Sequence, residues 1–204
     1  IPTPPGYEIS ATGEAEWQAE SFQRIFLALF ASIIFMYMVL ASQYESFVDP
    51  LSIMVSLPLA LVGAMLGLLI GGTSVSIISL IGVVLLMGLV SKNAILLIDF
   101  VKQARRAGDD RTTAILKAGP IRLRPILMTA LTTILGLVPL ALGLGEGAEL
   151  RKPMAHAVIG GMISSTLLTL IVVPVVYTII EDFFGLFRRK RKHAAESAAS
   201  PTAV

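Results

Sequence analysis

The sequence contains no cysteine and only two histidines among its 204 residues. The absence of thiols excludes disulfides, thiolate nucleophiles and cysteine-based metal sites, and it leaves the redox compartment open. His156 and His193 are too few to form a His-rich metal cluster within this chain. A P-loop, a dinucleotide fingerprint, a zincin motif and a nucleophile elbow are also missing. We therefore expect neither an enzyme nor an ATP-driven motor in this chain, and no bound cofactor.

Charged residues are also scarce, at 15% of the chain, whereas 55% of the residues are hydrophobic. Five apolar segments account for this excess, and each is near or above the ~20 residues that a helix needs to cross ~30 Å of hydrocarbon. The segments do not alternate as barrel strands would, and helices satisfy their own backbone in lipid. The sequence therefore predicts an all-α polytopic membrane protein. The segments cover about residues 22–40, 51–70, 75–98, 125–144 and 154–180.

The connections between these segments differ in length. Residues 43–50 and the tighter Gly71-Gly72-Thr73 are short turns, whereas residues 99–124 form one long connection. Within it, Asp109 or Asp110 is a suitable helix N-cap, and Gly119-Pro120 is a suitable stop. We expect a short amphipathic helix there, lying on the cytoplasmic membrane surface.

Lysine and arginine gather at two places that lie on the same side of the predicted membrane, because two crossings separate them. The positive-inside rule puts both clusters in the cytoplasm and the N-terminus outside. Arg151 and Lys152, in the last outer turn, are the clear exception. The basic run after the fifth segment is typical of an anchor attracted to anionic lipid, and we expect no nucleic-acid role. The clusters are Lys102, Arg105, Arg106, Arg111, Lys117, Arg122 and Arg124, and Arg188, Arg189, Lys190, Arg191 and Lys192.

The two ends of the chain have few apolar residues. Residues 1–21 hold too few to form a core of their own, and the alanine- and serine-rich residues after His193 are typical of a disordered tail. Five crossings with an exported N-terminus would be unusual for a complete protein, and no signal peptide begins the chain. We therefore expect that an N-terminal portion is missing.

Lys92 is the only basic residue well inside an apolar segment. A charge in hydrocarbon costs at least ~2.5–3.5 kcal/mol on insertion scales, so such a residue usually faces a bundle interior or a partner. No acidic residue lies in the middle of any segment, and Asp99, two turns away on the same face, is expected at the interface. A carboxylate partner of Lys92 must then come from outside this chain. The alternative is that Lys92 snorkels to the interface, because Ile98 lies only about 9 Å further along the axis.

Polar and small residues within the other segments have simpler explanations. A threonine in a membrane helix bonds the carbonyl one turn earlier or packs as a small interface residue. Small residues repeated every four positions allow close helix packing. His156 is expected near the outer interface. These features are Thr129, Thr132 and Thr133, and the patterns Gly63-x-x-x-Gly67-x-x-x-Gly71 and Ala157-x-x-x-Gly161-x-x-x-Ser165.

Four stretches of the sequence resemble resistance–nodulation–division (RND) efflux pumps. Residues 88–100, GLVSKNAILLIDF, resemble the tenth transmembrane helix of these pumps, and residues 122–129, RLRPILMT, resemble the start of the eleventh. Residues 43–50 resemble the turn between the eighth and ninth helices, and residues 1–7 resemble the last strand of the porter domain. The resemblance implies a division into the end of a periplasmic porter region (1–21), a transmembrane bundle segment (22–187) and a cytoplasmic tail (188–204). The bundle would have twelve helices, of which this chain supplies the eighth to twelfth.

The family resemblance also implies a function and partners. RND pumps are homotrimers of the bacterial inner membrane, in which proton influx drives the export of drugs and other amphiphiles. They join a periplasmic adaptor protein and an outer-membrane channel. The energy source would be the proton motive force, with no cofactor.

The motif match also implies site residues. Lys92 would be the relay lysine, which in this family pairs with two aspartates on the fourth helix, a helix that this chain lacks. Thr129 would be the relay threonine, and Arg122 would lie near the cytoplasmic proton path, although positive-inside placement explains Arg122 equally well. A lysine at this position favours the hydrophobe/amphiphile branch of the family. The alternatives are a non-transporting membrane scaffold or assembly subunit, and a sensing domain of an RND-like protein.

Overall fold

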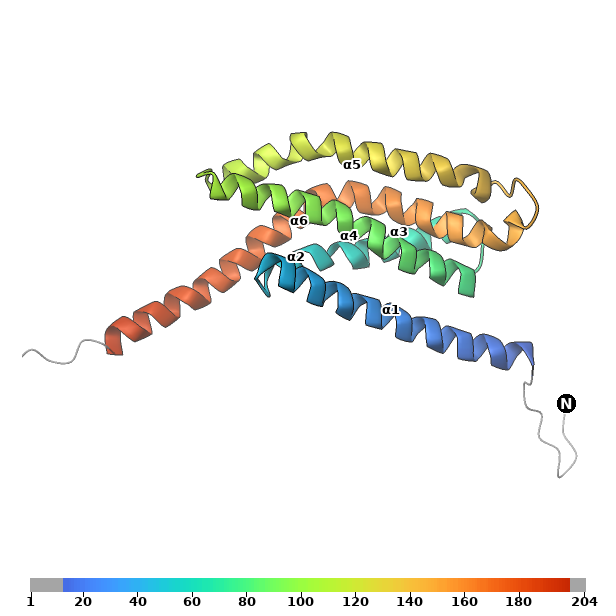
Figure 1. Ribbon diagram of the computed structural model, residues 1–204, viewed down its shortest axis with the longest axis horizontal. Helices are drawn as coiled ribbons and strands as arrows, with labels where there is room; N and C mark the ends of the chain where they lie inside the picture. The colour runs from blue at the N-terminus through green and yellow to red at the C-terminus, as the bar shows by residue number, and fades with distance from the viewer. Residues whose placement is uncertain (1–12, 199–204) are drawn as a thin grey trace, which may run out of the picture.

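Six helices make up the part of the chain that the computed structural model describes, which is the backbone of residues 13–198. Side-chain surroundings are given within this range except at positions 14, 15, 181 and 183–198. Five stretches are long and apolar enough to cross a membrane, so the predicted all-α fold with five membrane helices is confirmed. The helices are α1 (Glu14–Tyr44), α2 (Asp49–Met54), α3 (Ser56–Ile70), α4 (Ile77–Arg106), α5 (Arg111–Ala141) and α6 (Ala148–Ala198) (Figure 1).

The second membrane span consists of two helices, α2 and α3, which meet at Val55. Pro58 explains the break, because its nitrogen has no proton to donate and its ring displaces the carbonyl of Met54, four residues earlier. Before this span, Glu45 ends α1 in the left-handed conformation, with φ 49°. The Ser46 hydroxyl then accepts from the backbone N–H groups of Val48 and Asp49 at 3.3 and 3.4 Å.

The long connection predicted over residues 99–124 is mostly helical, and the expected separate amphipathic helix is wrong. α4 continues to Arg106, and α5 begins at Arg111 with Asp110 as its N-cap, as the sequence indicated. The stop expected at Gly119-Pro120 is also wrong, because α5 runs through three prolines to Ala141. Packing explains the extension: Val101, Ala114 and Ala118 are buried in one apolar cluster between the helix ends. Each proline removes one helical hydrogen bond, and membrane helices tolerate this loss.

Small residues bring α3 and α6 into close contact, which confirms the packing role predicted for the glycine pattern on α3. A Cβ on Gly67 would lie 2.9 Å from the Gly160 Cα, and a Cβ on Gly63 would lie 2.8 Å from the Gly160 carbonyl oxygen. The facing row on α6 is His156, Gly160 and Ser164, one position earlier than the predicted row. In the predicted row, Gly161 instead packs against Leu86 of α4 and Ala60 of α3.

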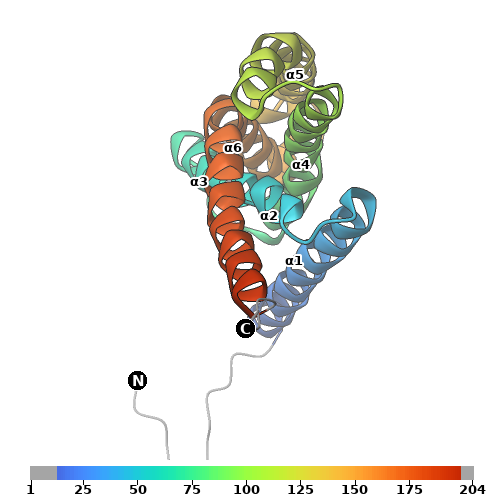
Figure 2. The same ribbon diagram turned by 90° about the vertical axis from the view of Figure 1, so that its left-hand side faces the viewer.

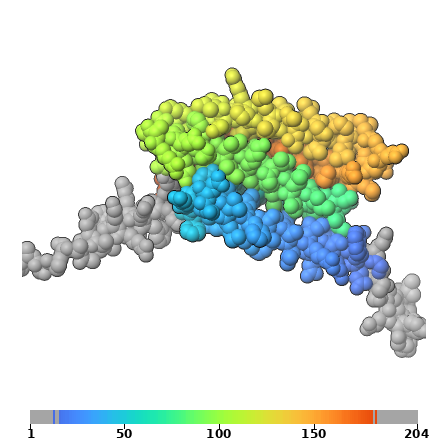
Figure 3. Space-filling model, in the orientation of Figure 1, coloured from blue at the N-terminus to red at the C-terminus, as the bar shows by residue number. Residues whose placement is uncertain are grey.

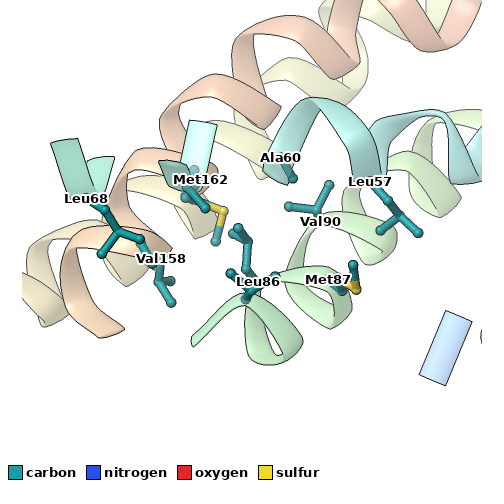
Figure 4. Packing of buried hydrophobic residues seen from close by; sticks show 12 residues of the cluster. Leu57, Ala60, Leu68, Leu86, Met87, Val90, Val158 and Met162 are labelled. Atoms are coloured by element: carbon teal, nitrogen blue, oxygen red, sulfur yellow. The ribbon is translucent and has the colours of Figure 1, made fainter. Parts of the chain in front are cut away.

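The apolar core lies where α3, α4 and α6 meet. One cluster of buried residues includes Leu57 and Leu68 of α3, Leu86 and Val90 of α4, and Met162 of α6 (Figure 4). α4 lies between α5 on one side and α1 on the other (Figure 2). It is the most buried of the five spans, and α1 is the least buried, since the N-terminal half of α1 diverges from the other helices (Figures 1 and 3).

The turns divide into two groups at opposite ends of the bundle (Figure 1). The α1–α2 and α4–α5 turns lie at one end, and the α3–α4 and α5–α6 turns lie at the other. The basic residues of the 99–124 region therefore share an end with the α1–α2 turn. There Arg111 donates to the Asp182 carboxylate of α6, through Nη2 at 3.4 Å and through a second, shorter hydrogen bond from Nη1. Of the predicted end regions, residues 1–12 and 199–204 lie outside the described residues.

Candidate functional site

Lys92 lies on the open face of α4, the central helix. Ile81, Leu85, Gly88 and Lys92 are exposed and follow one another at intervals of four, three and four residues, so they form a single stripe along the helix. The other faces of α4 pack against α3, α5 and α6. The one lysine within the apolar segments predicted from the sequence thus belongs to the face that these helices leave uncovered.

The neighbours of Lys92 hold its backbone in place. Ser91 and Asn93 are both buried. The Ser91 hydroxyl donates to the Met87 carbonyl at 2.6 Å and lies 2.8 Å from the sulfur of Met36 on α1. Because its flanking residues are packed, Lys92 projects from a fixed part of the helix.

Lys92 lies near the middle of α4. It is fourteen residues from Arg106 and fifteen from Ile77, about 21 Å and about 23 Å along the axis. α4 continues past Ile98 into the charged stretch that ends at Arg106, so the end of the helix does not mark the interface that a snorkelling Lys92 would reach. Within the described part of the chain, Lys92 makes no hydrogen bond or ion pair with another side chain.

Thr129 lies on an exposed part of α5, directly before the buried Ala130. Its hydroxyl lies 3.1 Å from the carbonyl oxygen of Pro125 and 3.0 Å from that of Ile126. Thr132 and Thr133 likewise donate to carbonyls one turn earlier, each at 2.8 Å. The local bonding predicted for these threonines is therefore confirmed, and it leaves the Thr129 side chain on the outside of the bundle.

Arg122 lies at the contact between α5 and α4. Its guanidinium carbon is 5.2 Å from the centre of the Phe100 ring, a distance suited to a cation–π interaction. Its Nε is buried and has no hydrogen-bond partner within the described residues. The structure joins Arg122 to α4 through Phe100, and among the described side chains no hydrogen bond links it to Lys92 or Thr129.

An ion pair that the sequence did not reveal fixes the basic end of α4. Lys102 Nζ is 2.6 Å from the Asp49 carboxylate at the start of α2, and the two side chains are only 22% and 16% exposed. Lys102 also lies 4.7 Å from the centre of the Tyr44 ring on α1, and the Tyr44 hydroxyl donates to the Ile95 carbonyl at 3.2 Å. The sequence alone places Lys102 only in the positive-inside cluster. No sequence pattern pairs residues 53 positions apart.

The site residues thus divide into two arrangements. Lys92 and Thr129 are exposed on α4 and α5, and each is open to a further partner. Lys102 instead contacts both Asp49 and Tyr44 and so joins three helices. Among the described residues, no group of three or more acidic or histidine side chains is placed to hold a metal ion.

Comparison with known proteins identifies similar chains. The sequence profile of the AcrB/AcrD/AcrF family matches residues 1–181. Two curated relatives, each called multidrug resistance protein MdtC, come from Pectobacterium carotovorum subsp. carotovorum and Pectobacterium atrosepticum. This chain is 42% identical to each over 201 residues, which are 98% of this chain and 19% of the relative.

Solved structures are similar as well. Two crystal forms of a heavy metal efflux pump match with TM-scores of 0.79 and 0.73, at 30% and 32% sequence identity. The matches cover 88% and 83% of this chain, and 18% and 17% of those chains. The chain therefore spans about a fifth of the length of the proteins it resembles.

Proposed function

This chain belongs to the AcrB/AcrD/AcrF family of RND efflux pumps, and we propose that it carries part of the proton relay of an inner-membrane transporter that exports drugs and other amphiphiles in exchange for protons. The observation that carries this proposal is the placement of Lys92. A lone lysine at mid-helix, on the uncovered face of the central helix, has a charge that needs a carboxylate partner. The relay requires such a partner, and the upstream part of the same pump would supply it from its fourth helix.

The relay would work through competition for Lys92. While the partner carboxylates are ionised, they hold the ammonium group by ion pairing. When protons entering from the periplasm neutralise them, the attraction is lost, and Lys92 turns toward Thr129. The Thr129 hydroxyl already has local carbonyl acceptors, and its oxygen has a remaining lone pair for an ammonium donor. The movement would shift α4 against α5 and pass to the periplasmic part of the pump.

The substrate class rests on the similar proteins and on Lys92. The curated relatives are called multidrug resistance proteins, whereas the similar solved structures are of a heavy metal efflux pump. A lysine at the relay position supports the amphiphile-exporting branch. The absence of a candidate metal cluster among the described residues adds nothing for or against metal export, because substrates would bind outside this chain.

The assembly and orientation follow from the same proposal. The basic end of the bundle, with the α4–α5 turn, would face the cytoplasm, and the start of α1 would face the periplasm. The complete pump would be a homotrimer in the inner membrane, joined to a periplasmic adaptor and an outer-membrane channel.

Replacing Lys92 in the whole pump tests the proposal. Lys92→Ala should abolish drug efflux, measured by the minimum inhibitory concentration and by dye efflux, while expression and oligomer size stay normal. Lys117→Ala is the matched control, because Lys117 is an exposed lysine that pairs with Asp109 at the α4–α5 turn. Normal efflux by the Lys92→Ala pump would refute the relay. If Lys92→Leu also left every phenotype intact, the chain would act as a membrane scaffold instead.

A further inference from the structure

A cavity of about 320 Å³ lies between α1 and α4, on the basic side of Lys92. Its apolar wall is formed by Leu40 of α1 and Ile95 of α4, and its polar wall by Gln43, Asp99 and Arg106, among others. Ile95 is one helical turn from Lys92, whereas Arg106 is the last residue of α4. The cavity therefore extends from the basic end of the bundle almost to the depth of the proposed relay.

The cavity has the size and polarity to hold water. A water molecule occupies about 30 Å³ of liquid, and a buried water needs two to four polar partners. The carboxylate of Asp99, the amide of Gln43 and the guanidinium of Arg106 supply such partners. Gln43 and Arg106, which line the cavity at the basic end of the bundle, are both exposed, so the water inside would exchange with the solution beyond the membrane.

Asp99 is the acidic residue that lines this cavity among those the structure describes. It lies seven residues from Lys92 on the same helix, and this spacing puts both on one face, about 10.5 Å apart along the axis. One carboxylate oxygen accepts from Gln103 Nε2 at 3.0 Å. No cation pairs with Asp99 within the described part of the chain, since Lys102 is bonded to Asp49. Asp99 thus has an oxygen free to take up a proton.

We propose that this cavity is the route by which protons leave the relay for the cytoplasm, and that Asp99 is the group that accepts them. The inference rests on the proposed function, and it assigns the exit to a residue and to a space between two named helices. A proton leaves the carboxylic acid that partners Lys92, crosses water past Ile95, and binds the Asp99 carboxylate. The partner becomes a carboxylate again and re-forms its ion pair with Lys92. Asp99 then releases the proton to water at the cavity mouth.

The chemistry favours Asp99 over Lys92 as the acceptor. A proton transfer between two carboxyl groups joins groups of similar ordinary pKa. The Lys92 ammonium group already carries its proton, and to pass the proton on it would have to donate to a much weaker base. Positioned carboxylates are established general bases in proteins. The charged and titratable groups around Asp99 are Lys102 and Arg106 on α4, Tyr44 on α1, and Asp49 on α2.

The first test is proton flux through the whole pump in proteoliposomes, with the pH difference across the membrane held constant. Asp99→Asn should slow substrate-driven proton flux by about tenfold, because it removes the acceptor. Asp99→Glu should restore most of the rate.

Two controls separate this inference from a structural role and from the proposed function. Asp109→Asn removes a carboxylate at the same end of the bundle that pairs with Lys117, outside the cavity, and it should leave flux unchanged. A pump inactivated by Lys92→Ala but with an unchanged rate of proton flux in Asp99→Asn would overturn the exit route alone. A pump that needs neither residue would overturn both proposals. An Asp99→Glu pump as slow as Asp99→Asn would also overturn the assignment of Asp99.

The cavity itself can be tested by filling it. This chain has no cysteine, so Gln43→Cys places a single thiol at the cavity wall of this part of the pump. A bulky water-soluble thiol reagent should attach there and reduce proton flux severalfold. Ser42→Cys, the exposed neighbour on α1, is the matched control and should retain its flux after labelling. Full flux in the labelled Gln43→Cys pump would refute a route through this cavity.

Discussion

The close contact between α3 and α6 predicts that Gly67→Ala destabilises the membrane domain. A Cβ at this position would lie 2.9 Å from the Gly160 Cα and 3.1 Å from the Gly160 nitrogen, and closer still to the His156 carbonyl oxygen. All three are backbone atoms of a packed helix, so a rotating side chain cannot relieve the clash. α6 itself would have to move away.

The expected magnitude follows from two opposing contributions. Adding a methyl group to a well-packed interior costs about 1–3 kcal/mol. Alanine in place of a helical glycine returns about 0.5–1 kcal/mol, because it lowers the entropy of the unfolded chain. Since the clash is with backbone, the upper part of the first range applies, and the net loss should be about 1–2.5 kcal/mol. For a domain of about 200 residues that corresponds to roughly 2–10 °C in Tm, and the shift should be smaller for the longer whole pump.

Two further glycines supply graded controls. At Gly161 the nearest atom belongs to the flexible end of the Leu86 side chain, and the Ala60 carbonyl oxygen follows at 3.0 Å. Gly161→Ala should therefore be less harmful than Gly67→Ala. Gly136 of α5 has open space around it, so Gly136→Ala should leave stability unchanged or raise it slightly. The assay is thermal unfolding of the whole pump in detergent, followed by size-exclusion chromatography. The reasoning is refuted if Gly67→Ala melts with the wild type, or if Gly136→Ala is the most harmful of the three.

Four further predictions concern individual interactions. Lys102→Met and Asp49→Asn should each destabilise the pump, because each leaves a mostly buried partner unpaired. In a double-mutant cycle, the two losses in the free energy of unfolding should be less than additive by about 1–3 kcal/mol. The hydrogen bonds from Arg111 hold the pKa of the Asp182 carboxyl below its usual value. The contact should therefore contribute its full stabilisation at pH values above the usual pKa of an aspartate, and this stabilisation should be lost as the pH falls through the lowered pKa of the folded state. Acid unfolding curves of the wild type and Asp182→Asn should converge at that lower pH. A constant separation of the two curves at all pH values would contradict the prediction. Thr129→Ser should retain efflux and Thr129→Val should reduce it, whereas equal efflux by both in a dye assay would exclude the hydroxyl from the relay. Residues 1–204 expressed alone should confer no drug resistance, because Lys92 has no carboxylate partner among the described residues, and a reproducible rise in resistance would count against the relay.

The sequence was sufficient for the membrane helices and insufficient for their ends. Long apolar runs predicted five spans because hydrocarbon thickness sets their length. The ends of α4 and α5 were missed because Val101, Ala114 and Ala118 lie among charged residues, and only tertiary packing makes them core residues. Pro58 explains the helix break at Val55, whereas α5 continues through three prolines without a break. Proline alone therefore does not mark the end of a helix.

Of the candidate site, the sequence predicted Lys92 but not the Asp49–Lys102 ion pair or the cavity beside Asp99. Lys92 stands out because a charge within an apolar run is costly, and this signal needs no knowledge of the fold. Asp49 and Lys102 gave no such signal, because each lies near a membrane boundary where charges are common. Their pairing depends on the α1–α2 turn folding back onto α4. The cavity beside Asp99 likewise depends on how α1 crosses α4, which no local pattern specifies.

The attachment of α1 has a mechanical consequence. α1 is the least buried span, and near its C-terminal end Tyr44 bonds α4 while Asp49, just beyond the turn, is bonded to Lys102. The C-terminal half of α1 is held against the bundle, since Leu29, Ile33 and Met36 also pack against the core. The stretch from Glu14 to Ala28 is therefore a lever about 22 Å long. A tilt of about 5° where this stretch leaves the bundle would displace its far end by about 2 Å. A small rearrangement of the bundle at Leu29 would thus be delivered, enlarged, to the start of α1.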